Sequence, residues 1–317
     1  MGFARVTSMA AIASAIACAA PVETEEAQPA SAAEETAPAA PVKVHRRIDF
    51  EPVPHGMVVP DALTARNETP ATPALVDHGG RVAATIHFYL LFWGTGFEPT
   101  TPSLYATFLG GLGASAWWTI DSQYLRGAAN HASFVKSYTD AHTAPSSTVS
   151  DAALRAELAR VIAAGSLPYD ANGVYYVVTP KNVKVCSNGA CSCENFCGYH
   201  SAFASTAGVV LYAAIPSAAA CPSSCGVFAS DATSPNRNVE ADEGVSIMAH
   251  EGAEAQSDAY GDAWFDGSGW ENGDKCAYTY GTTTRAANGA AMNAAWGGKS
   301  WLVQMNWSNR VWACVQR

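Results

Sequence analysis

Residues 245–258 carry a histidine and two glutamates at the spacing that metal-dependent hydrolases use. The residues are His250, Glu251 and Glu254, in the order His-Glu-x-x-Glu. On an α-helix, positions four apart lie on one face, so the His250 imidazole and the Glu254 carboxylate can converge on one ion. The pattern is that of the His-Glu-x-x-His zinc peptidases, with the second histidine replaced by a carboxylate, which zinc also accepts.

Catalytic zinc needs three protein ligands, an open position for water, and a base that takes the proton of that water. We expect His250 and Glu254 to be two of the ligands, and Glu251, about 100° further round the helix, to be the base. Without a metal, His250 and Glu254 would form a helix-face pair worth only a few tenths of a kcal/mol. Glu251 favours an enzyme, because a purely structural metal does not need such a base.

The third ligand is expected from the segment that follows this helix. Glu271 lies 21 residues beyond His250, and Asp274 lies 24 residues beyond it. We predict Glu271 as the third ligand, with Asp274 as a fourth group or as a support for the ligands. Two alternatives stay open. Asp258 would lie about 12 Å from His250 if the helix continued unbroken for two turns, and His200 could approach from a cysteine-rich loop.

The segment 266–274 also suggests a different metal. It combines glycines with five oxygen-bearing side chains, a composition that suits Ca²⁺. These side chains belong to Asp266, Ser268, Glu271, Asn272 and Asp274. The spacing is not that of an EF-hand, and such segments are often solvated turns. If calcium binds here, the third zinc ligand must come from elsewhere.

The composition excludes several classes of function. Hydrophobic residues make up 49% of the 317 residues and charged residues 15%, which is enough apolar material for a sizeable core. The net charge of −10 argues against a nucleic-acid partner. No apolar run after the first twenty residues is long enough to cross a bilayer. No glycine-rich phosphate loop and no Gly-x-Ser-x-Gly motif is present, so neither a nucleotide cofactor nor serine-hydrolase chemistry is expected.

Residues 1–18 are typical of an export signal, with a basic residue near the start, a short apolar stretch and small residues at the end. Cys18 ends this segment in a loose lipobox, so a lipid anchor at Cys18 and ordinary cleavage nearby are alternatives of equal weight. Eight of the nine cysteines remain. An even number in an exported chain predicts four disulfides, whose pairing the sequence does not fix.

The order of elements predicts one α/β domain over residues 76–317, preceded by a disordered Pro/Ala/Glu-rich linker over residues 19–75. Strands are expected where β-branched and aromatic residues are dense, at 81–93, 173–179, 208–215, 300–307 and 311–314. Helices are expected at 102–112, 152–164, capped by Ser150 or Asp151, and 245–258. We therefore expect a mixed sheet with packed helices and a disulfide-stapled loop at 186–197, with an α+β arrangement as the alternative.

Six short motifs occur in a fixed order between Asp77 and Arg317. They are Phe92-Trp93-Gly94, Ser115-Ala-Trp-Trp118, Gly173–Pro180, Phe196–His200, Cys221–Cys225 and the terminal Cys314. In this order and spacing they resemble the EXORDIUM or phosphate-induced protein family. The resemblance implies an extracellular or wall-associated protein, linked in plants to growth control. The segments His250–Ala255, Phe265-Asp266 and Glu271–Cys276 resemble a microbial branch, whose His-Glu-x-x-Glu helix the plant members lack.

Together these features predict a secreted or surface-tethered zinc-dependent hydrolase, peptidase-like, that acts on a peptide, protein or cell-wall substrate. The alternative is a non-catalytic extracellular protein that binds cell-wall glycans. Nine tryptophans, among them Trp117, Trp118, Trp264 and Trp270, would then supply a stacking platform for sugar rings. Against this stands the tendency of tryptophan to be largely buried.

Overall fold

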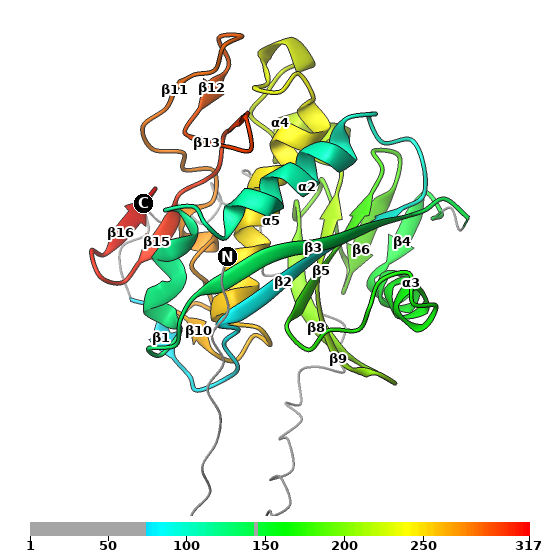
Figure 1. The fold of residues 1–317 in the computed structure, drawn as a ribbon, viewed down its shortest axis with the longest axis horizontal. Helices are drawn as coiled ribbons and strands as arrows, with labels where there is room; N and C mark the ends of the chain where they lie inside the picture. The colour runs from blue at the N-terminus through cyan, green and yellow to red at the C-terminus, as the bar shows by residue number, and fades with distance from the viewer. Residues whose placement is uncertain (1–73, 143–144) are drawn as a thin grey trace, which may run out of the picture. The chain divides into compact units, whose positions relative to one another are not determined.

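The computed structural model describes residues 74–142 and 145–317, and it confirms the α/β class with a mixed sheet (Figure 1). The expected export signal over residues 1–18, the lipid anchor at Cys18, and the linker up to residue 73 lie outside the described residues. Within the described part, no helix is long and apolar enough to span a bilayer.

The main sheet has five strands, four of them parallel and one antiparallel at the edge. Their spatial order is β3 (His131–Asp140), β2 (Thr85–Trp93), β5 (Gly173–Thr179), β9 (Gly208–Pro216) and β8 (Tyr199–Ser205). Strands β2 and β5 fall within the predicted runs, and β9 ends one residue beyond its run. Their apolar side chains are buried on both faces of the sheet, which is why the sequence marks them. The sequence did not predict β3 or β8, the two edge strands, which carry more polar residues.

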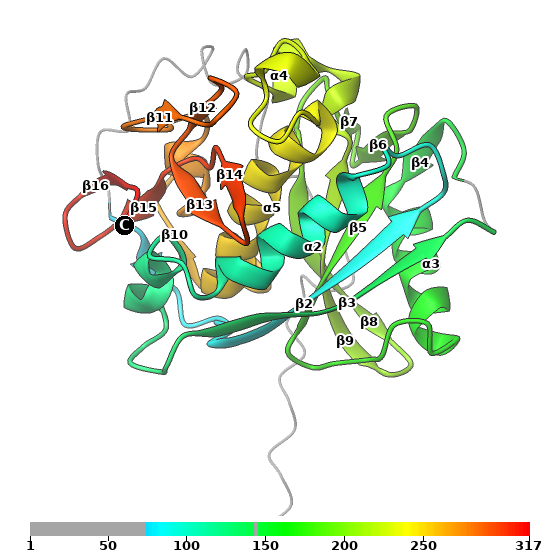
Figure 2. The ribbon, with the colours of Figure 1, turned by 45° about the horizontal axis from the view of Figure 1, so that its top comes forward.

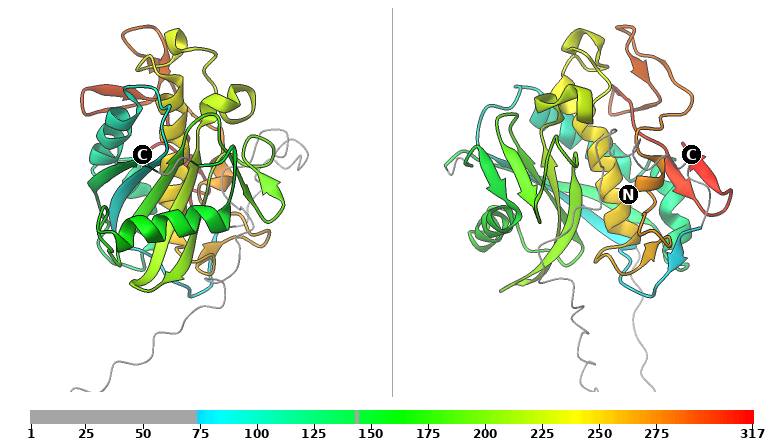
Figure 3. Two further views of the ribbon diagram at one scale, coloured as in Figure 1. Left: turned by 90° about the vertical axis from the view of Figure 1, so that its right-hand side faces the viewer. Right: turned by 180° about the vertical axis from the view of Figure 1, so that it is seen from behind.

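Helices cover both faces of this sheet. The even-numbered residues 86–92 of β2 pack with α2 (Thr101–Leu112) and α5 (Val239–Ser257). The odd-numbered residues 89–93 pack on the other face with α3 (Asp151–Ala163), which lies across the sheet from α5 (Figure 3, left). Helix α3 begins at Ser150, whose Oγ accepts a hydrogen bond of 3.2 Å from the backbone N–H of Ala153. Ser150 is therefore the cap, and Asp151 is the first helical residue.

Helix α5 begins six residues before the predicted start, at Val239. Asn238 caps it by accepting a hydrogen bond of 2.9 Å from the backbone N–H of Ala241. The first turns, Val239–Gly244, are polar and lack an apolar face, so the periodicity of the sequence did not predict them as helix. Every residue of α5 from 240 to 257 is buried, because the helix lies between the sheet and the segment 258–317 (Figure 3, right).

The segment 258–317 consists of short antiparallel pairs joined by irregular backbone. The pairs are β10 (Trp264–Phe265) with β1 (Val76–Asp77), β11 (Thr284–Arg285) with β12 (Ala291–Met292), β13 (Ala294–Trp296) with β14 (Lys299–Trp301), and β15 (Asn306–Ser308) with β16 (Ala313–Val315). The predicted strand over residues 300–307 is therefore wrong as one element. Between β14 and β15 the backbone donates to the side chains of Asn293 and Ser246 instead of to a neighbouring strand.

The eight expected cysteines form four disulfides, as predicted. The pairs are Cys186–Cys191, Cys193–Cys221, Cys197–Cys225 and Cys276–Cys314. The first closes the hairpin of β6 (Lys184–Ser187) and β7 (Ala190–Cys191), which forms a small sheet with β4 (Thr148–Ser150). The next two tie the chain before β8 to residues 221–225, which include α4 (Pro222–Cys225). The fourth joins Cys276, at the end of η4 (Asp274–Cys276), to Cys314 in β16.

Two adjacent glycines of α2 test how the β13–β14 hairpin docks on this helix (Figure 2). A Cβ atom on Gly111 would lie 2.1 Å from Cδ1 of Trp296, whereas one on Gly110 would have no atom within 4 Å. We expect Gly111→Ala to lower the free energy of unfolding by about 1–3 kcal/mol through overpacking. Gly110→Ala should raise it by about 0.5–1 kcal/mol, because alanine is the better helix former. Urea denaturation of both variants measures the difference, and shifts in the same direction would contradict this docking.

Candidate metal centre

The acidic residues of α5 fall into two groups with different surroundings. Three of them, Glu240, Asp242 and Glu243, lie in the first turns of the helix, where its dipole favours negative charge. Each carboxylate accepts two or more hydrogen bonds, from Thr101 and Ser217, from Asn236, and from the backbone of residues 227–228, respectively. The protein itself therefore satisfies these three carboxylates.

The second group, Glu251 and Glu254, lies towards the end of the helix, where the dipole disfavours negative charge. The Glu254 carboxylate is fully buried between two imidazoles. Its Oε1 lies 3.0 Å from Nε2 of His250, and its Oε2 lies 3.6 Å from Nδ1 of His200. His250 and Glu254 face each other as their spacing predicts. His200 comes from β8 and not from the stapled loop, and its Nδ1 also lies 3.7 Å from Oε2 of Glu251.

Glu271 and Asp274 fold back onto these side chains from the segment after α5. Asp274 Oδ1 lies 3.5 Å from Nε2 of His250, and Glu271 Oε1 lies 3.9 Å from Nε2 of His200. The backbone N–H of Asp274 donates a hydrogen bond of 2.9 Å to Glu254 Oε1. Two sets of donor atoms result, each with all its atoms within 4.8 Å of one another: His250, Glu254 and Asp274, and His200, Glu254 and Glu271. Asp274 thus lies with His250, whereas Glu271 lies with His200.

Glycine is required between these two acidic residues. A Cβ atom on Gly273 would lie 2.9 Å from Glu254 Oε1 and 3.0 Å from Cγ of His250. The backbone of the segment can therefore approach α5 closely enough to bring Asp274 to His250 only because Gly273 has no side chain.

Hydrogen bonds fix which nitrogen of each imidazole carries a proton. His250 Nδ1 lies 3.1 Å from Oε1 of Gln304, and the amide of Gln304 donates a hydrogen bond of 2.8 Å to the carbonyl of Gly273. Because Gln304 Oε1 can only accept, His250 Nδ1 must donate. His200 Nε2 likewise lies 3.1 Å from the carbonyl oxygen of Asp258. In the neutral imidazoles, the lone pairs of His250 Nε2 and His200 Nδ1 therefore face Glu254, as ligand nitrogens would.

The two remaining candidates from the sequence have other partners. Helix α5 ends at Ser257, and Asp258 Oδ1 accepts hydrogen bonds of 2.6 and 2.7 Å from the backbone N–H groups of Asp262 and Ala263. In the segment 266–274, Asp266 forms an ion pair of 3.0 Å with Lys275. Asn272 is hydrogen-bonded to Asp121 and Ser257, and Glu271 and Asp274 lie at the centre around Glu254. The oxygens proposed as calcium ligands therefore do not converge on one point.

The buried charges of this cluster shift the pKa values of its members. Burial and the neighbouring Glu254 raise the pKa of Asp274 to about 8 and that of Glu271 well above its usual value. Burial alone would raise the pKa of Glu254, but the two imidazoles lower it to about 2. Burial would also lower the pKa of each histidine, yet the surrounding carboxylates raise both pKa values well above the usual range. Without a metal, protons must therefore neutralise these carboxylates.

Five buried atoms of the centre make no hydrogen bond within the part of the chain that the structure describes. They are His200 Nδ1, His250 Nε2, Glu254 Oε2, Glu271 Oε1 and Asp274 Oδ1. Buried polar atoms are nearly always hydrogen-bonded, so such a group calls for an explanation. Imidazole nitrogens and carboxylate oxygens are the ligands that Zn²⁺ accepts, and the donor set therefore fits a divalent cation of this kind.

Protons should leave the centre when zinc binds. Both imidazoles have raised pKa values in the metal-free protein, and a zinc ligand must be deprotonated. We expect about one to two protons to be released per zinc. For each proton displaced, the zinc affinity should fall about tenfold for every unit by which the pH is lowered. Calorimetric titration in buffers of different ionisation enthalpy measures the number. A zinc affinity that does not change between about pH 5 and pH 8 would show that the two imidazoles are not protonated in the metal-free protein.

Gln304 should support the centre without binding the metal. Loss of its Oε1 in Gln304→Ala frees the His250 ring to rotate, so we expect zinc affinity to fall about 10–100-fold. Gln123→Ala is the matched control, because Gln123 donates to the carbonyl of Ile120 outside the centre. Competition with a fluorescent chelator measures both affinities. Equal affinities of the two variants would show that Gln304 does not orient His250.

The sequence did not suggest Gln304, because nothing in its neighbourhood marks it as different from other polar residues. It lies 54 residues from His250 along the chain. The sequence offered His200 as an alternative third ligand. Its position at the start of β8 places it beside α5.

Comparison with known proteins supports the resemblance noted in the sequence. A family model described as the phosphate-induced protein 1 conserved region matches residues 75–316 of the 317. No curated protein and no solved structure matches the chain. The matched range covers both sides of the sheet, helix α5, and the segment that closes over it. The chain therefore belongs to the phosphate-induced protein family, also called EXORDIUM.

Proposed function

We propose that this member of the family is an exported metal-dependent hydrolase whose centre is built on α5. The observation that carries the proposal is the convergence of five buried atoms without hydrogen bonds around the Glu254 carboxylate. Four disulfides in the described part and the membership in an extracellular family support the exported location.

His250, Glu254 and Asp274 are the proposed zinc ligands. The sequence had favoured Glu271 as the third ligand, but the distance of 3.5 Å between Asp274 Oδ1 and His250 Nε2 favours Asp274 at this position. Bound zinc lowers the pKa of a coordinated water towards neutrality. Glu251, fully buried on the same helix, is the proposed general base that accepts the proton of this water and passes it to the leaving group.

The substrate we propose is a peptide bond, in a protein or in a cell-wall peptide. The motif on α5 resembles that of zinc peptidases, whose water attacks a carbonyl carbon while a glutamate takes its proton. His200 and Glu271 are the least buried members of the centre, with side chains 6% and 5% exposed. The substrate would therefore approach from their side.

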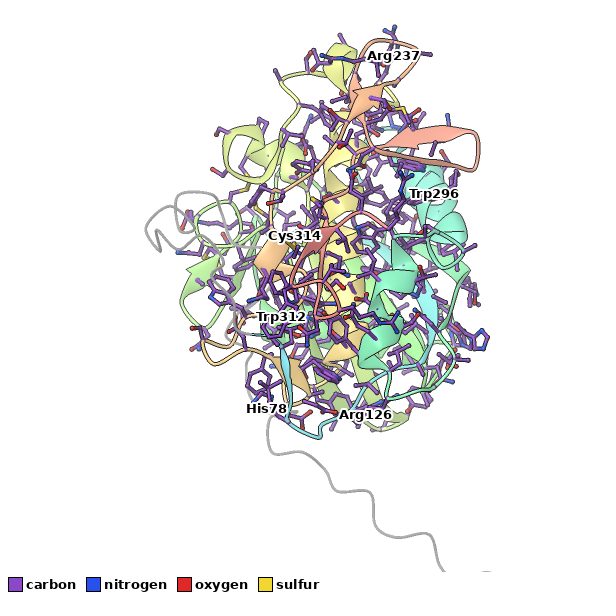
Figure 4. All side chains as sticks on the ribbon, turned by 90° about the vertical axis from the view of Figure 1, so that its left-hand side faces the viewer. His78, Arg126, Arg237, Trp296, Trp312 and Cys314 are labelled. Carbon is purple, nitrogen blue, oxygen red and sulfur yellow. A yellow bond between two sulfur atoms is a disulfide. The ribbon has the colours of Figure 1, made fainter. Side chains whose placement is uncertain are left out.

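The burial of the centre favours a second candidate, a non-catalytic extracellular protein in which the metal holds the segment 258–317 on α5. Structural zinc sites are closed, whereas catalytic sites keep an open position. If this second candidate binds glycans, Trp117 and Trp118 cannot serve as stacking residues, because they are core residues, 5% and 0% exposed. Trp312, one of the nine tryptophans but not one of the four named from the sequence, is 56% exposed beside Cys314 on the outer side of the segment (Figure 4).

Substitution of Glu251 separates the two candidates. Glu251→Gln keeps the shape of the side chain but removes the base, so we expect hydrolysis to fall by about 10²–10⁴-fold with zinc retained. His250→Ala should lose hydrolysis and lower the zinc content. Turnover of fluorogenic peptides and of wall peptides, together with elemental analysis, gives both quantities.

Glu243→Gln is the matched control. It changes another buried glutamate of α5, whose Oε1 accepts two backbone hydrogen bonds of 2.6 Å that glutamine can also accept. We expect this variant to retain zinc and hydrolysis. Full activity in Glu251→Gln would disprove the proposed base. Zinc-loaded protein without activity on any peptide would favour the structural role.

A further inference from the structure

We infer that the centre binds two divalent cations, with Glu254 as the carboxylate that bridges them. The inference rests on the proposed function, which supplies the kind of ion. It adds the number of ions and the role of His200 and Glu271 as ligands. Each of the two donor sets has one imidazole and one carboxylate of its own, and they share only Glu254.

The geometry of Glu254 is that of a bridge. Its Oε1 faces His250 at 3.0 Å, and its Oε2 faces His200 at 3.6 Å. A carboxylate that gives one oxygen to each of two ions holds them at the separation of about 3.5–4 Å found in two-metal hydrolytic sites. Asp274 then completes the set on the side of His250, and Glu271 completes the set on the side of His200.

One cation would account for only part of the buried atoms that lack hydrogen bonds. With an ion bound by His250, Glu254 Oε1 and Asp274, three buried atoms would still make no hydrogen bond, namely His200 Nδ1, Glu254 Oε2 and Glu271 Oε1. A buried polar atom that nothing binds keeps its full desolvation cost, which is larger when the atom is charged. A second cation on the side of His200 satisfies all three.

The protonation of His200 supports its role as a ligand. Its Nε2 lies 3.1 Å from the Asp258 carbonyl oxygen, which can only accept a hydrogen bond, so the neutral ring has its lone pair on Nδ1. This arrangement mirrors that of His250 and Gln304. Both imidazoles are thus held by a fixed acceptor on one nitrogen while the other nitrogen faces the shared carboxylate.

The charges also balance with two ions. Glu251, Glu254, Glu271 and Asp274 carry four negative charges when they are ionised, and the two histidines are neutral when they bind metal. Two divalent cations compensate the four charges, whereas one would leave two of them to be neutralised by protons. An uncompensated buried charge is strongly unfavourable.

Metal stoichiometry of the full chain tests the inference. Protein loaded with Mn²⁺ and freed of excess ion should contain two ions per chain by elemental analysis, and its electron paramagnetic resonance spectrum should show two coupled ions. His200→Ala and His250→Ala should each fall from two ions to one, with loss of the coupling. His87→Ala is the control, since His87 pairs with Asp170 at 2.6 Å outside both donor sets, and it should keep two.

The outcomes distinguish this inference from the proposed function. One ion per wild-type chain, retained in His200→Ala, would overturn the two-metal centre while leaving a metal-dependent hydrolase intact. No ion in the wild-type chain would overturn both. Two ions retained in His200→Ala would overturn the assignment of His200. The wild-type stoichiometry and coupling do not depend on whether a variant folds, so the test stands even if a substitution destabilises the protein.

Discussion

The rest of the structure depends on the burial of acidic side chains on a helix that has no face in solvent. Helix α5 is enclosed by the sheet on one side and by the segment 258–317 on the other, and it carries no lysine or arginine. An ionised carboxylate in such a place must be hydrogen-bonded or paired with a cation. At the start of the helix, backbone N–H groups and hydroxyls meet this requirement. Near its end Glu254 lies between two imidazoles, close to further carboxylates, and accepts one backbone hydrogen bond, so protons or bound cations balance the charge there.

The segment that closes over α5 is held in place by contacts that do not involve the proposed ligand atoms. Asp121 accepts hydrogen bonds of 2.8 Å from the amides of Asn272 and Asn306, which links the chain between Glu271 and Asp274 to β15. The disulfide Cys276–Cys314 fastens the same chain to β16. Gln304 then reaches from this segment to His250. The positions of Glu271 and Asp274 are therefore set by the packing of the last sixty or so residues against η1 (Trp118–Tyr124) and α5.

This construction relates the family fold to the proposed chemistry. The sheet and its helices form a scaffold with two apolar cores, one on each face, and neither core needs a metal. The polar centre lies at the join between that scaffold and the segment 258–317. A member of the family could therefore lose the centre and keep the sheet, whereas in a member with these carboxylates the join also depends on how their buried charge is neutralised. Metal binding and the docking of the segment would be coupled in such a member.

The sequence by itself determined the elements that are encoded locally. The dense apolar runs of β2, β5 and β9, the face of α3 and its cap at Ser150, and the pairing of His250 with Glu254 follow from periodicity and spacing within a few residues. The even number of cysteines after the expected export signal predicted four disulfides, and the ordered motifs indicated the family. These features need no knowledge of distant parts of the chain.

Only the tertiary structure decided which distant residues meet. The polar first turns of α5 are helical because the surrounding protein buries and caps them, which outweighs their weak apolar pattern. His200 and Gln304 reach the centre across separations of about fifty residues, and no local pattern records such contacts. Asp274 lies beside His250 and Glu271 beside His200 because the backbone approaches α5 closely at Gly273 and because of the way the last segment folds. Spacing could place carboxylates near the helix, but only the packed backbone could assign each one to its histidine.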